Sequence, residues 1–552
     1  MKLAGFTLTL VLAGIFAGNA PGQTPTVGGL LNNYSFTLPG LPNYGIAEGS
    51  IFDIFGTNLA STTVPLQGPP LKTTLSGVSI AVTVNGVNTQ PLIYFVSPGQ
   101  IAAILPSATP VGTGTITVTT AGGTSAPFPI QVVESAFGLL TTNNGSGPLQ
   151  GFDASNKGTL LSFSAAANPG DILELWGTGL GPTPGDATGV AVTPSAQVLI
   201  GGISATVLYS GRSSYAGLDQ INVKVPAGLS GCNVSVVVET GNYLSNFATL
   251  PLTASGRTCS DPSNPITTSI LNQITQTGTF SLGFVLLNQT TTPGISVLGV
   301  TEGGGTTDSA YASFLKFTYA QFNAGAYASA LGGTSVGSCV VSFFNSSSTS
   351  TTAPPAFTFT YLNAGPDINI TGPDGPLVMP LTIEDGFDIY TTPTTATSFI
   401  PATGGTFMFN NGSGGPDIGA FTTQLDMGSP LVWSNMASIS TVTRSNGLTV
   451  NWTGGGSGSY VSITGSSFGA INGSSIDFVV GSFTCQAPVA AGTFTVPAPV
   501  LQSLPQSFTI AGISTSTLSV SNVTGPVSFT AQGLDVGLLE ANVENTISVT
   551  YQ

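Results

Sequence analysis

The sequence predicts an all-β protein made of tandem immunoglobulin-like β-sandwich domains. Three observations lead to this prediction. The 73 glycines and 38 prolines divide the chain into short β-branched runs, which is typical of strands joined by turns. Two stretches of the N-terminal half repeat each other about 120 residues apart. The 552 residues also exceed what one compact core holds, so several domains are expected.

The first 22 residues have the features of a secretory signal peptide. Met1-Lys2 is followed by an apolar run, Leu3–Ala17, and then by the small residues Gly18-Asn19-Ala20. Cleavage after Gly22 avoids a proline at the next position and leaves a mature chain that starts at Gln23. No later run of 18 apolar residues follows, so we expect an exported chain with no transmembrane segment in its mature part.

The internal repeat defines the first two domains. The pattern G-x-I-x-[DE]-[IL]-[FW]-G-T-x-L stands at Gly49–Leu59 and again at Gly170–Leu180, 121 residues later. A second pair of landmarks, Gln100 and Gln220, is displaced by 120 residues. The two pairs of matching positions thus have nearly the same spacing in the sequence. This common spacing predicts tandem modules in the size range of immunoglobulin-like sandwiches, which we place at 23–135 and 136–255.

Within the repeated pattern, the apolar positions fit a buried strand. Ile51, Ile54 and Phe55, like Ile172, Leu175 and Trp176, would face a sandwich core. The acidic residue of each copy, Asp53 or Glu174, is expected to point out of the core or to lie at a sheet edge. Because each carboxylate stands alone in its module, we do not interpret either as catalytic.

A longer series of motifs runs through this half of the chain. They are Val96–Ile101, Ala167–Gly181, Ile200–Val207 and Asp219–Pro226. In this order they resemble an uncharacterised module of secreted proteins of Acidobacteria, and Gly56–Leu59 makes the first half similar to the IPT/TIG group of immunoglobulin-like domains. The resemblance covers about residues 30–255 and departs from the family at Ser210–Gly217. It implies a secreted, immunoglobulin-like architecture and supplies no known activity, so no catalytic residue is carried over.

Charge and histidine content exclude several classes of function. The chain has 8 Lys and Arg against 23 Asp and Glu, a net charge of −15, which argues against nucleic-acid binding and against anionic membranes. It contains no histidine, so a Ser–His or Cys–His catalytic group and a zinc site built on imidazole are both excluded. We therefore expect a protein that is not an enzyme and that uses no cofactor.

Four cysteines in an exported chain favour two disulfides. The simplest pairing joins Cys232 with Cys259, 27 residues apart, and Cys339 with Cys485. Four cysteines allow three connectivities, and the spacing alone leaves the other two open.

The C-terminal half keeps the strand pattern after a polar linker at 256–264. Short β-branched or aromatic runs occur at Phe280–Leu287, Val340–Phe344, Phe357–Leu362, Leu448–Trp452, Tyr460–Ile463 and Asp477–Phe483. Only Asp308–Leu331 has a more helical pattern, which a short helix or a buried loop would fit. We predict two sandwiches, 256–400 and 401–552.

Few residues of this half are candidates for a site. Trp433 is the one candidate ligand contact, as an exposed ring for sugar stacking, whereas alternation places Trp452 in a core. Asp367, Asn369 and Asp374 lack the calcium-loop pattern and its closing Glu. The glycine-rich stretch 453–458 lacks the spacing and the Lys of a phosphate-binding loop. We name no catalytic, cofactor-binding or metal-binding residue.

The function predicted is that of a secreted or cell-surface, non-enzymatic protein with a structural, display or adhesive role. Its partner would be a cell-surface polysaccharide or another protein. Two alternatives stay open. One is an array of polysaccharide-binding modules, which a row of exposed aromatic residues would favour. The other is a secreted glycoside hydrolase, which would need two carboxylates on one face of a cleft, about 5–10 Å apart.

Overall fold

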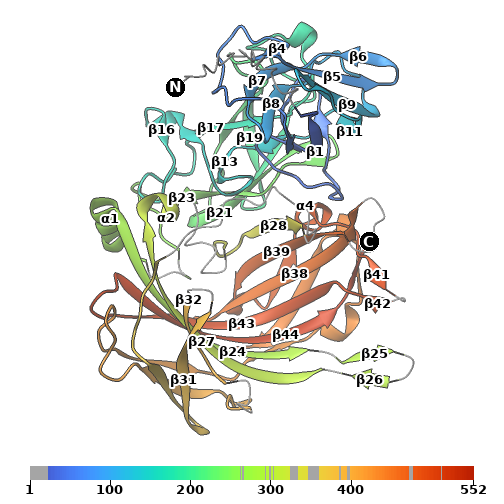
Figure 1. Ribbon diagram of the computed structural model, residues 1–552. Coiled ribbons are helices and arrows are strands. Elements are labelled where there is room, and N and C mark those ends of the chain that lie inside the picture. The colour runs from blue at the N-terminus through green and yellow to red at the C-terminus, as the bar shows by residue number, and fades with distance from the viewer. Residues whose placement is uncertain are drawn as a thin grey trace, which may run out of the picture.

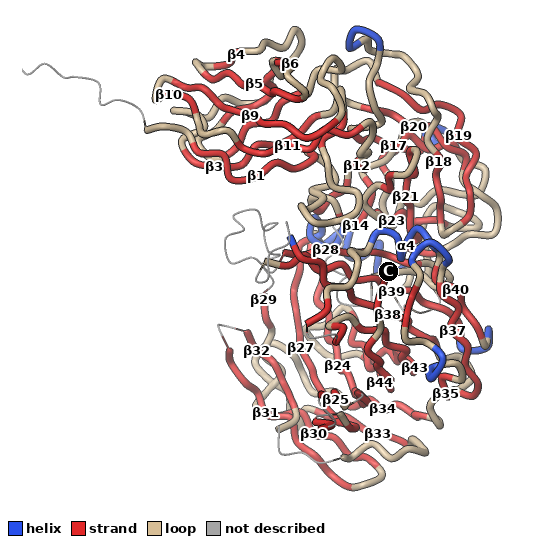
Figure 2. The backbone as a smooth tube through the Cα atoms, turned by 90° about the vertical axis from the view of Figure 1, so that its right-hand side faces the viewer, coloured by secondary structure: helices blue, strands red, loops and turns tan. Residues whose placement is uncertain are grey.

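The structure is a computed structural model that describes residues 23–552 except 262, 264–265, 293, 298–299, 303, 324–332, 346–359, 385–386, 394–397, 472–476 and 511–512. It confirms the predicted fold class, because nearly all regular elements are strands arranged in packed sheets. Figures 1 and 2 show two smaller β-modules side by side above a large C-terminal β-region. No helix in the described ranges is long and apolar enough to span a bilayer. The predicted signal peptide lies outside the described residues.

The first module (residues 23–135) is a two-sheet sandwich. One sheet has the order β1-β3-β8-β7, and the other has the order β2-β11-β9-β5-β4, with β6 and β10 at its margins. Side chains of β5 alternate strictly, so Ile80 and Val82 are buried in the core between the sheets. The strands are β1 (Thr26–Asn32), β2 (Ile46–Ala47), β3 (Ile51–Thr57), β4 (Thr74–Leu75), β5 (Val78–Val84), β6 (Val87–Thr89), β7 (Leu92–Val96), β8 (Gln100–Ile104), β9 (Gly112–Thr120), β10 (Gly123–Thr124) and β11 (Phe128–Val133).

The second module (residues 136–255) has the same plan with one difference. Its strand β19 pairs with β18 along its first half and with β20 along its second half, so the two sheets are joined along one long strand. The strands are β12 (Gly138–Leu139), β13 (Thr141–Asn143), β14 (Ser146–Leu149), β15 (Phe152–Asp153), β16 (Thr159–Leu160), β17 (Ile172–Thr178), β18 (Gln197–Ile200), β19 (Ile203–Arg212), β20 (Asp219–Lys224), β21 (Gly231–Thr240), β22 (Tyr243–Leu244) and β23 (Ala248–Leu252).

The sequence repeat is also a structural repeat. The two copies of the motif form β3 and β17, and each of these pairs with the strand that carries the second landmark, β8 or β20. A hydrogen bond recurs at the same displacement of 120 residues. The amide of Val118 donates to Ser125 Oγ at 3.1 Å, and the amide of Val238 donates to Ser245 Oγ at 2.9 Å. The two modules therefore share local structure as well as strand order.

The acidic position of the repeat differs between the copies. Glu174 is half-buried, in line with the expectation for it. Asp53 is fully buried, so the expectation that it would point away from the core was wrong. It lies on a strand paired on both sides, and Asn33 Nδ2 donates to both of its oxygens at 3.0 Å. Burial raises the pKa of Asp53 to about 6, against hydrogen bonds from Gln100 and Asn33 that lower it.

The C-terminal region (residues 256–552) is built on a sheet with the order β28-β39-β38-β43-β44-β24-β27-β32-β31-β30-β33-β34, with β29 beside β27. Its main strands are β24 (Thr279–Thr292), β27 (Gly305–Thr318), β28 (Cys339–Asn345), β29 (Thr360–Tyr361), β30 (Asp367–Gly372), β31 (Gly375–Glu384), β32 (Phe387–Thr391), β33 (Gly405–Asn410), β34 (Thr422–Met427), β38 (Tyr460–Ala470), β39 (Phe478–Pro488), β43 (Thr517–Phe529) and β44 (Val536–Ser548). The smaller strands are β25 (Ile295–Val297), β26 (Val300–Glu302), β35 (Leu431–Trp433), β36 (Thr441–Val442), β37 (Leu448–Gly454), β40 (Thr493–Val496), β41 (Thr509–Ile510), β42 (Ile513–Ser514) and β45 (Thr550–Tyr551).

This sheet continues across the domain boundary that the sequence predicted at residue 400. Strand β24, from one side of that boundary, pairs in parallel with β44, from the other side. At the far end of the strand order, β34 lies against β43 and β44, so the sheet curls over itself. The curled part encloses one apolar core, which includes Phe407 and Phe409, while a second core near β38 and β39 includes Ile463 and Phe483.

Helices are few and short in the described chain. They include α1 (Thr268–Thr277), α2 (Tyr319–Asn323) and α4 (Ala498–Ser503). The stretch Asp308–Leu331, which has a helical pattern in the sequence, is mainly strand up to Thr318 and continues as the short helix α2. Its clustered aromatic residues therefore alternate between the two faces of β27 instead of forming one helical stripe.

Both predicted disulfides are confirmed. Cys232 pairs with Cys259, which ties β21 of the second module to the start of the C-terminal region. Cys339 pairs with Cys485 across the neighbouring strands β28 and β39, where the two residues are directly opposite.

Candidate functional site

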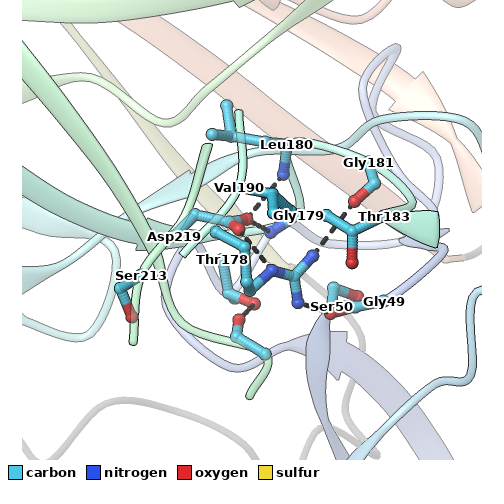
Figure 3. Close-up of polar contacts among 12 residues, drawn as sticks. Gly49, Ser50, Thr178, Gly179, Leu180, Gly181, Thr183, Val190, Ser213 and Asp219 are labelled. Atoms are coloured by element: carbon cyan, nitrogen blue, oxygen red, sulfur yellow. Dashed lines mark hydrogen bonds and ion pairs between the residues drawn. The ribbon is translucent and has the colours of Figure 1, made fainter. Parts of the chain in front are cut away.

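A buried ion pair lies where the first module meets the second (Figure 3). Arg212 ends β19 and Asp219 begins β20, and the Arg212 Nε lies 2.9 Å from Asp219 Oδ1. The other carboxylate oxygen accepts hydrogen bonds from the amides of Gly179 and Leu180, at 2.7 and 2.8 Å. Burial raises the pKa of Asp219 to about 6, although Arg212 and both amides lower it.

The same arginine reaches into the first module. Arg212 Nη1 donates to the carbonyl of Gly49, while its Nη2 donates to the carbonyl of Gly181 at 3.0 Å. Beside it, Thr178 Oγ1 accepts from the amide of Ile51 at 2.8 Å and donates to the carbonyl of Gly217 at 2.6 Å. Arg212 and Thr178 therefore join the two modules through buried hydrogen bonds.

A second junction joins the second module to the C-terminal region. The amide of Asn233 donates to Ser335 Oγ at 2.9 Å, and the amide of Ser235 donates to Ser338 Oγ at 2.8 Å. All four residues are buried, and the Cys232–Cys259 disulfide crosses the same boundary. Covalent and hydrogen-bonded contacts thus connect the modules, instead of a free linker alone.

The structure brings two carboxylates together, but in a structural role. Arg257 Nη1 lies 2.8 Å from Asp153 Oδ2 and 2.6 Å from Asp171 Oδ2. Asp153 Oδ1 also accepts from the amide of Asn156, and Asp171 Oδ2 accepts from the amide of Asn168. One arginine and two backbone amides thus hold both carboxylates in place, which fits a structural role.

Trp433, the candidate ligand contact, is not exposed. Only 5% of it is accessible, and its Nε1 donates to Asn435 Oδ1 at 3.1 Å. It lies directly opposite Trp452 in the pairing of β35 with β37, and both rings belong to one apolar core. The expectation of an exposed stacking ring is therefore corrected, and the reason is alternation: Val432, between two buried neighbours, is the exposed residue of β35.

Other aromatic residues do reach the surface. Tyr311 on β27, Tyr361 on β29 and Phe387 on β32 lie on one face of the large sheet, as their pairing registers require. The rings of Tyr361 and Phe387 are 4.9 Å apart at a tilt of 55°, and Phe387 is 46% exposed. We call these three residues the aromatic group. They are far apart in sequence, so no local pattern predicted their association.

A polar cleft of about 300 Å³ opens on the C-terminal region. It lies between the end of β34, the turn from β37 to β38, and the irregular part of β43. Its lining residues are Asp426, Gly428, Gly456, Ser457, Gly458, Ser459, Tyr460, Thr524, Gly525 and Pro526. The glycine-rich stretch at 453–458, which the sequence excluded as a phosphate-binding loop, thus supplies part of the wall.

Comparisons with known proteins give only weak likenesses. No family model matches the sequence, and no curated protein is detectably similar to it. Among solved structures, a surface glycan-binding protein of Bacteroides ovatus (SGBP-B, in complex with a mixed-linkage heptasaccharide) is 11% identical, with a TM-score of 0.21 over 54% of this chain and 71% of that one. Domains 4–9 of the S-layer protein SbsC are 9% identical, with a TM-score of 0.17 over 93% and 83%. The γ-CGTase of an alkalophilic Bacillus clarkii is 11% identical, with a TM-score of 0.16 over 52% of this chain and 37% of that one. Scores this low do not establish a common fold.

Proposed function

We propose that this chain is an exported, non-enzymatic protein of the bacterial surface or the extracellular space, where its β-modules form a stiff scaffold with a structural, display or adhesive role. The module resemblance in residues 30–255 supports the same setting. The observation that carries the proposal is the pair of buried module junctions. Arg212 hydrogen-bonds across the first junction, and Ser335 and Ser338 hydrogen-bond across the second. Modules held in this way keep a fixed spacing and direction, as a display protein requires.

Two further properties support the setting and the lack of catalysis. The disulfides fit an oxidising compartment outside the cytoplasm. The chain has no histidine, and Arg257 forms ion pairs with both members of the close carboxylate pair, Asp153 and Asp171. A scaffold needs neither a general base nor a nucleophile.

The test combines location with activity. Producing cells are fractionated, and intact cells are treated with a protease that cannot enter them. We expect the chain in the medium or exposed on intact cells, and purified chain that releases no reducing sugar from a polysaccharide panel. Retention in the cytoplasm would contradict the proposal. So would sugar release that copurifies with the chain, whether or not an Asp153→Asn/Asp171→Asn variant abolishes it.

The aromatic group favours a second candidate function, polysaccharide binding. Sugar rings stack on exposed aromatic faces, and here the exposed ring of Phe387 packs against the half-buried ring of Tyr361. Retention on insoluble cellulose, chitin and β-glucan tests this candidate. Phe387→Ala should lower retention, whereas Phe344→Ala, which removes a comparably exposed ring (54%) from β28, should not. Equal retention of both variants would reject it.

A further inference from the structure

The cleft has walls that are fixed from beneath by one buried side chain. Asn522 is only 4% exposed. Its Oδ1 accepts from the amide of Leu431, at the start of β35, at 3.0 Å. Its Nδ2 donates to Ser459 Oγ at 3.1 Å, and Ser459 Oγ in turn donates to the carbonyl of Gly456 at 2.6 Å. The two sides of the cleft are therefore held at a set separation before any ligand arrives, which lowers the entropic cost of binding.

The wall made by the glycine-rich turn carries unused hydrogen-bond donors. No acceptor within the described part of the chain bonds the amides of Gly456, Ser457 and Gly458. Backbone amides need a partner, so water or a ligand must satisfy them. A Cβ placed on Gly456 or Gly458 would meet nothing within 4 Å, so this wall is open to an approaching molecule.

The opposite wall carries acceptors. Asp426 is exposed, and its Oδ1 accepts from Thr406 Oγ1 at 2.6 Å. Its Oδ2 has no hydrogen-bond partner in the ranges that the structure describes. The cleft thus offers donors on one side and a carboxylate acceptor on the other, with the hydroxyl of Thr524 near the bulge of β43.

This combination selects among ligand classes. An anion would face the Asp426 carboxylate and a chain of net charge −15, so phosphate and acidic sugars are disfavoured. A cation would meet one carboxylate and a row of amide donors, which is a poor ligand set. An apolar molecule would leave the polar walls unpaired. A neutral molecule rich in hydroxyl groups can donate to the carboxylate and accept from the amides.

We propose that this cleft binds one or two units of a neutral saccharide, in the manner of an end or branch of a glycan chain. The volume of about 300 Å³ is at the small end of the range for ligand pockets, which fits a short saccharide and not an extended polymer. The inference deepens the adhesive role proposed above by naming the ligand class and its place. It does not require the aromatic group, which lies on other strands.

Glycine positions allow a test that fills the cleft without straining the fold. Gly456 and Gly428 both line it, neither has a positive φ, and neither would meet a contact shorter than 3.8 Å on gaining a Cβ. The variants Gly456→Trp and Gly428→Trp should therefore fold and obstruct the site. Gly68→Trp is the matched control, because Gly68 is exposed, likewise open and outside the cleft lining.

The experiment is calorimetric titration of the mature chain, residues 23–552, with neutral hexasaccharides of β-1,4-glucose, β-1,3-glucose, α-1,4-glucose and β-1,4-mannose, and with an oligogalacturonate as the anionic probe. We expect saturable binding of at least one neutral probe and none of the oligogalacturonate. Binding should be lost in both cleft-filling variants, weakened about 10-fold or more in Asp426→Ala, and unchanged in Gly68→Trp.

Three results would overturn the inference, each in protein whose circular dichroism and melting temperature match the wild type. They are no binding of any neutral probe, binding that survives both cleft-filling variants, and preferential binding of the oligogalacturonate. None of these results bears on where the chain is located. The proposed scaffold role is tested separately, by the fractionation experiment.

Discussion

Replacement of Arg212 by alanine is the perturbation that the module junction predicts to be most damaging. Arg212 is 3% exposed, and its guanidinium holds the Asp219 carboxylate and two backbone carbonyls. Without it, Asp219 keeps two amide donors but is buried without a counter-charge. Removal of one partner of a buried ion pair costs about 3–5 kcal/mol, so we expect the free energy of unfolding of the paired modules to fall by about 4 kcal/mol.

The assay needs to locate the loss as well as measure it. Urea unfolding gives the free energy, and hydrogen exchange with mass spectrometry reports on peptides from β3 and β17, which meet at the junction. Protection should fall in both peptides and should stay unchanged in β24 and β44, deep in the C-terminal sheet. Lys224→Ala is the matched control, because Lys224 is an exposed cation at the end of β20, with no ion pair among the described residues, so its loss should cost less than about 1 kcal/mol.

A double variant separates the charge from the packing. Arg212→Met with Asp219→Leu removes both charges and keeps most of the volume, but it leaves the two amides and two carbonyls that they bonded without those partners. It should therefore recover only the part of the Arg212→Ala loss that comes from the uncompensated charge. A cost of Arg212→Ala no larger than that of Lys224→Ala, or a loss of protection spread evenly over all modules, would refute this prediction.

Three other predictions follow from buried groups. Cys339→Ala with Cys485→Ala opens a loop of 146 residues and should destabilise the C-terminal region by about 3–5 kcal/mol in urea unfolding, an outcome that a loss below 1 kcal/mol would contradict. Burial raises the pKa of Glu540 from 4.5 to about 7, so its contribution to stability is full below pH 4.5 and is lost as the pH rises through 7; the unfolding free energy should fall by about 3 kcal/mol between pH 4.5 and 8, and Glu540→Gln should remove that part of the slope. Trp433→Ala should lower the free energy of unfolding by about 3–5 kcal/mol in chemical denaturation, because the ring fills a core. A change close to zero would contradict the burial of this ring.

The sequence was most informative where structure is local. The repeated motif predicted two similar modules, because a strand, its turn and its partner strand recur within one short stretch. The cysteine spacing favoured the observed pairs for a related reason: Cys232 and Cys259 lie close in the chain, which leaves the other two cysteines for each other.

Long-range pairing was not predictable in the same way. Strands β24 and β44 lie more than 240 residues apart in the chain, and their parallel pairing leaves no local pattern in either strand. The predicted division of the C-terminal half at residue 400 followed a composition change at 393–397. The sheet contains strands from both sides of that division. The aromatic group and the cleft were unpredictable for the same reason, because each consists of residues from strands that meet only in the folded chain.

Burial of single residues was predictable only where alternation was used. Leu431 and Trp433 flank Val432, and that alternation identifies Trp433 as a core residue, whereas its proximity to Pro430 favoured exposure. Arg212 had one indication in the sequence. It lies in Ser210–Gly217, a polar stretch at the end of β19, and this stretch is where the junction with the first module forms.

The scaffold account depends most directly on whether the three β-units move as one body. Small-angle X-ray scattering from the mature chain, residues 23–552, measures this in solution. The account predicts one profile that the arrangement in Figures 1 and 2 reproduces, and added flexibility in Arg212→Ala. A wild-type profile that requires an ensemble of separated modules would contradict it.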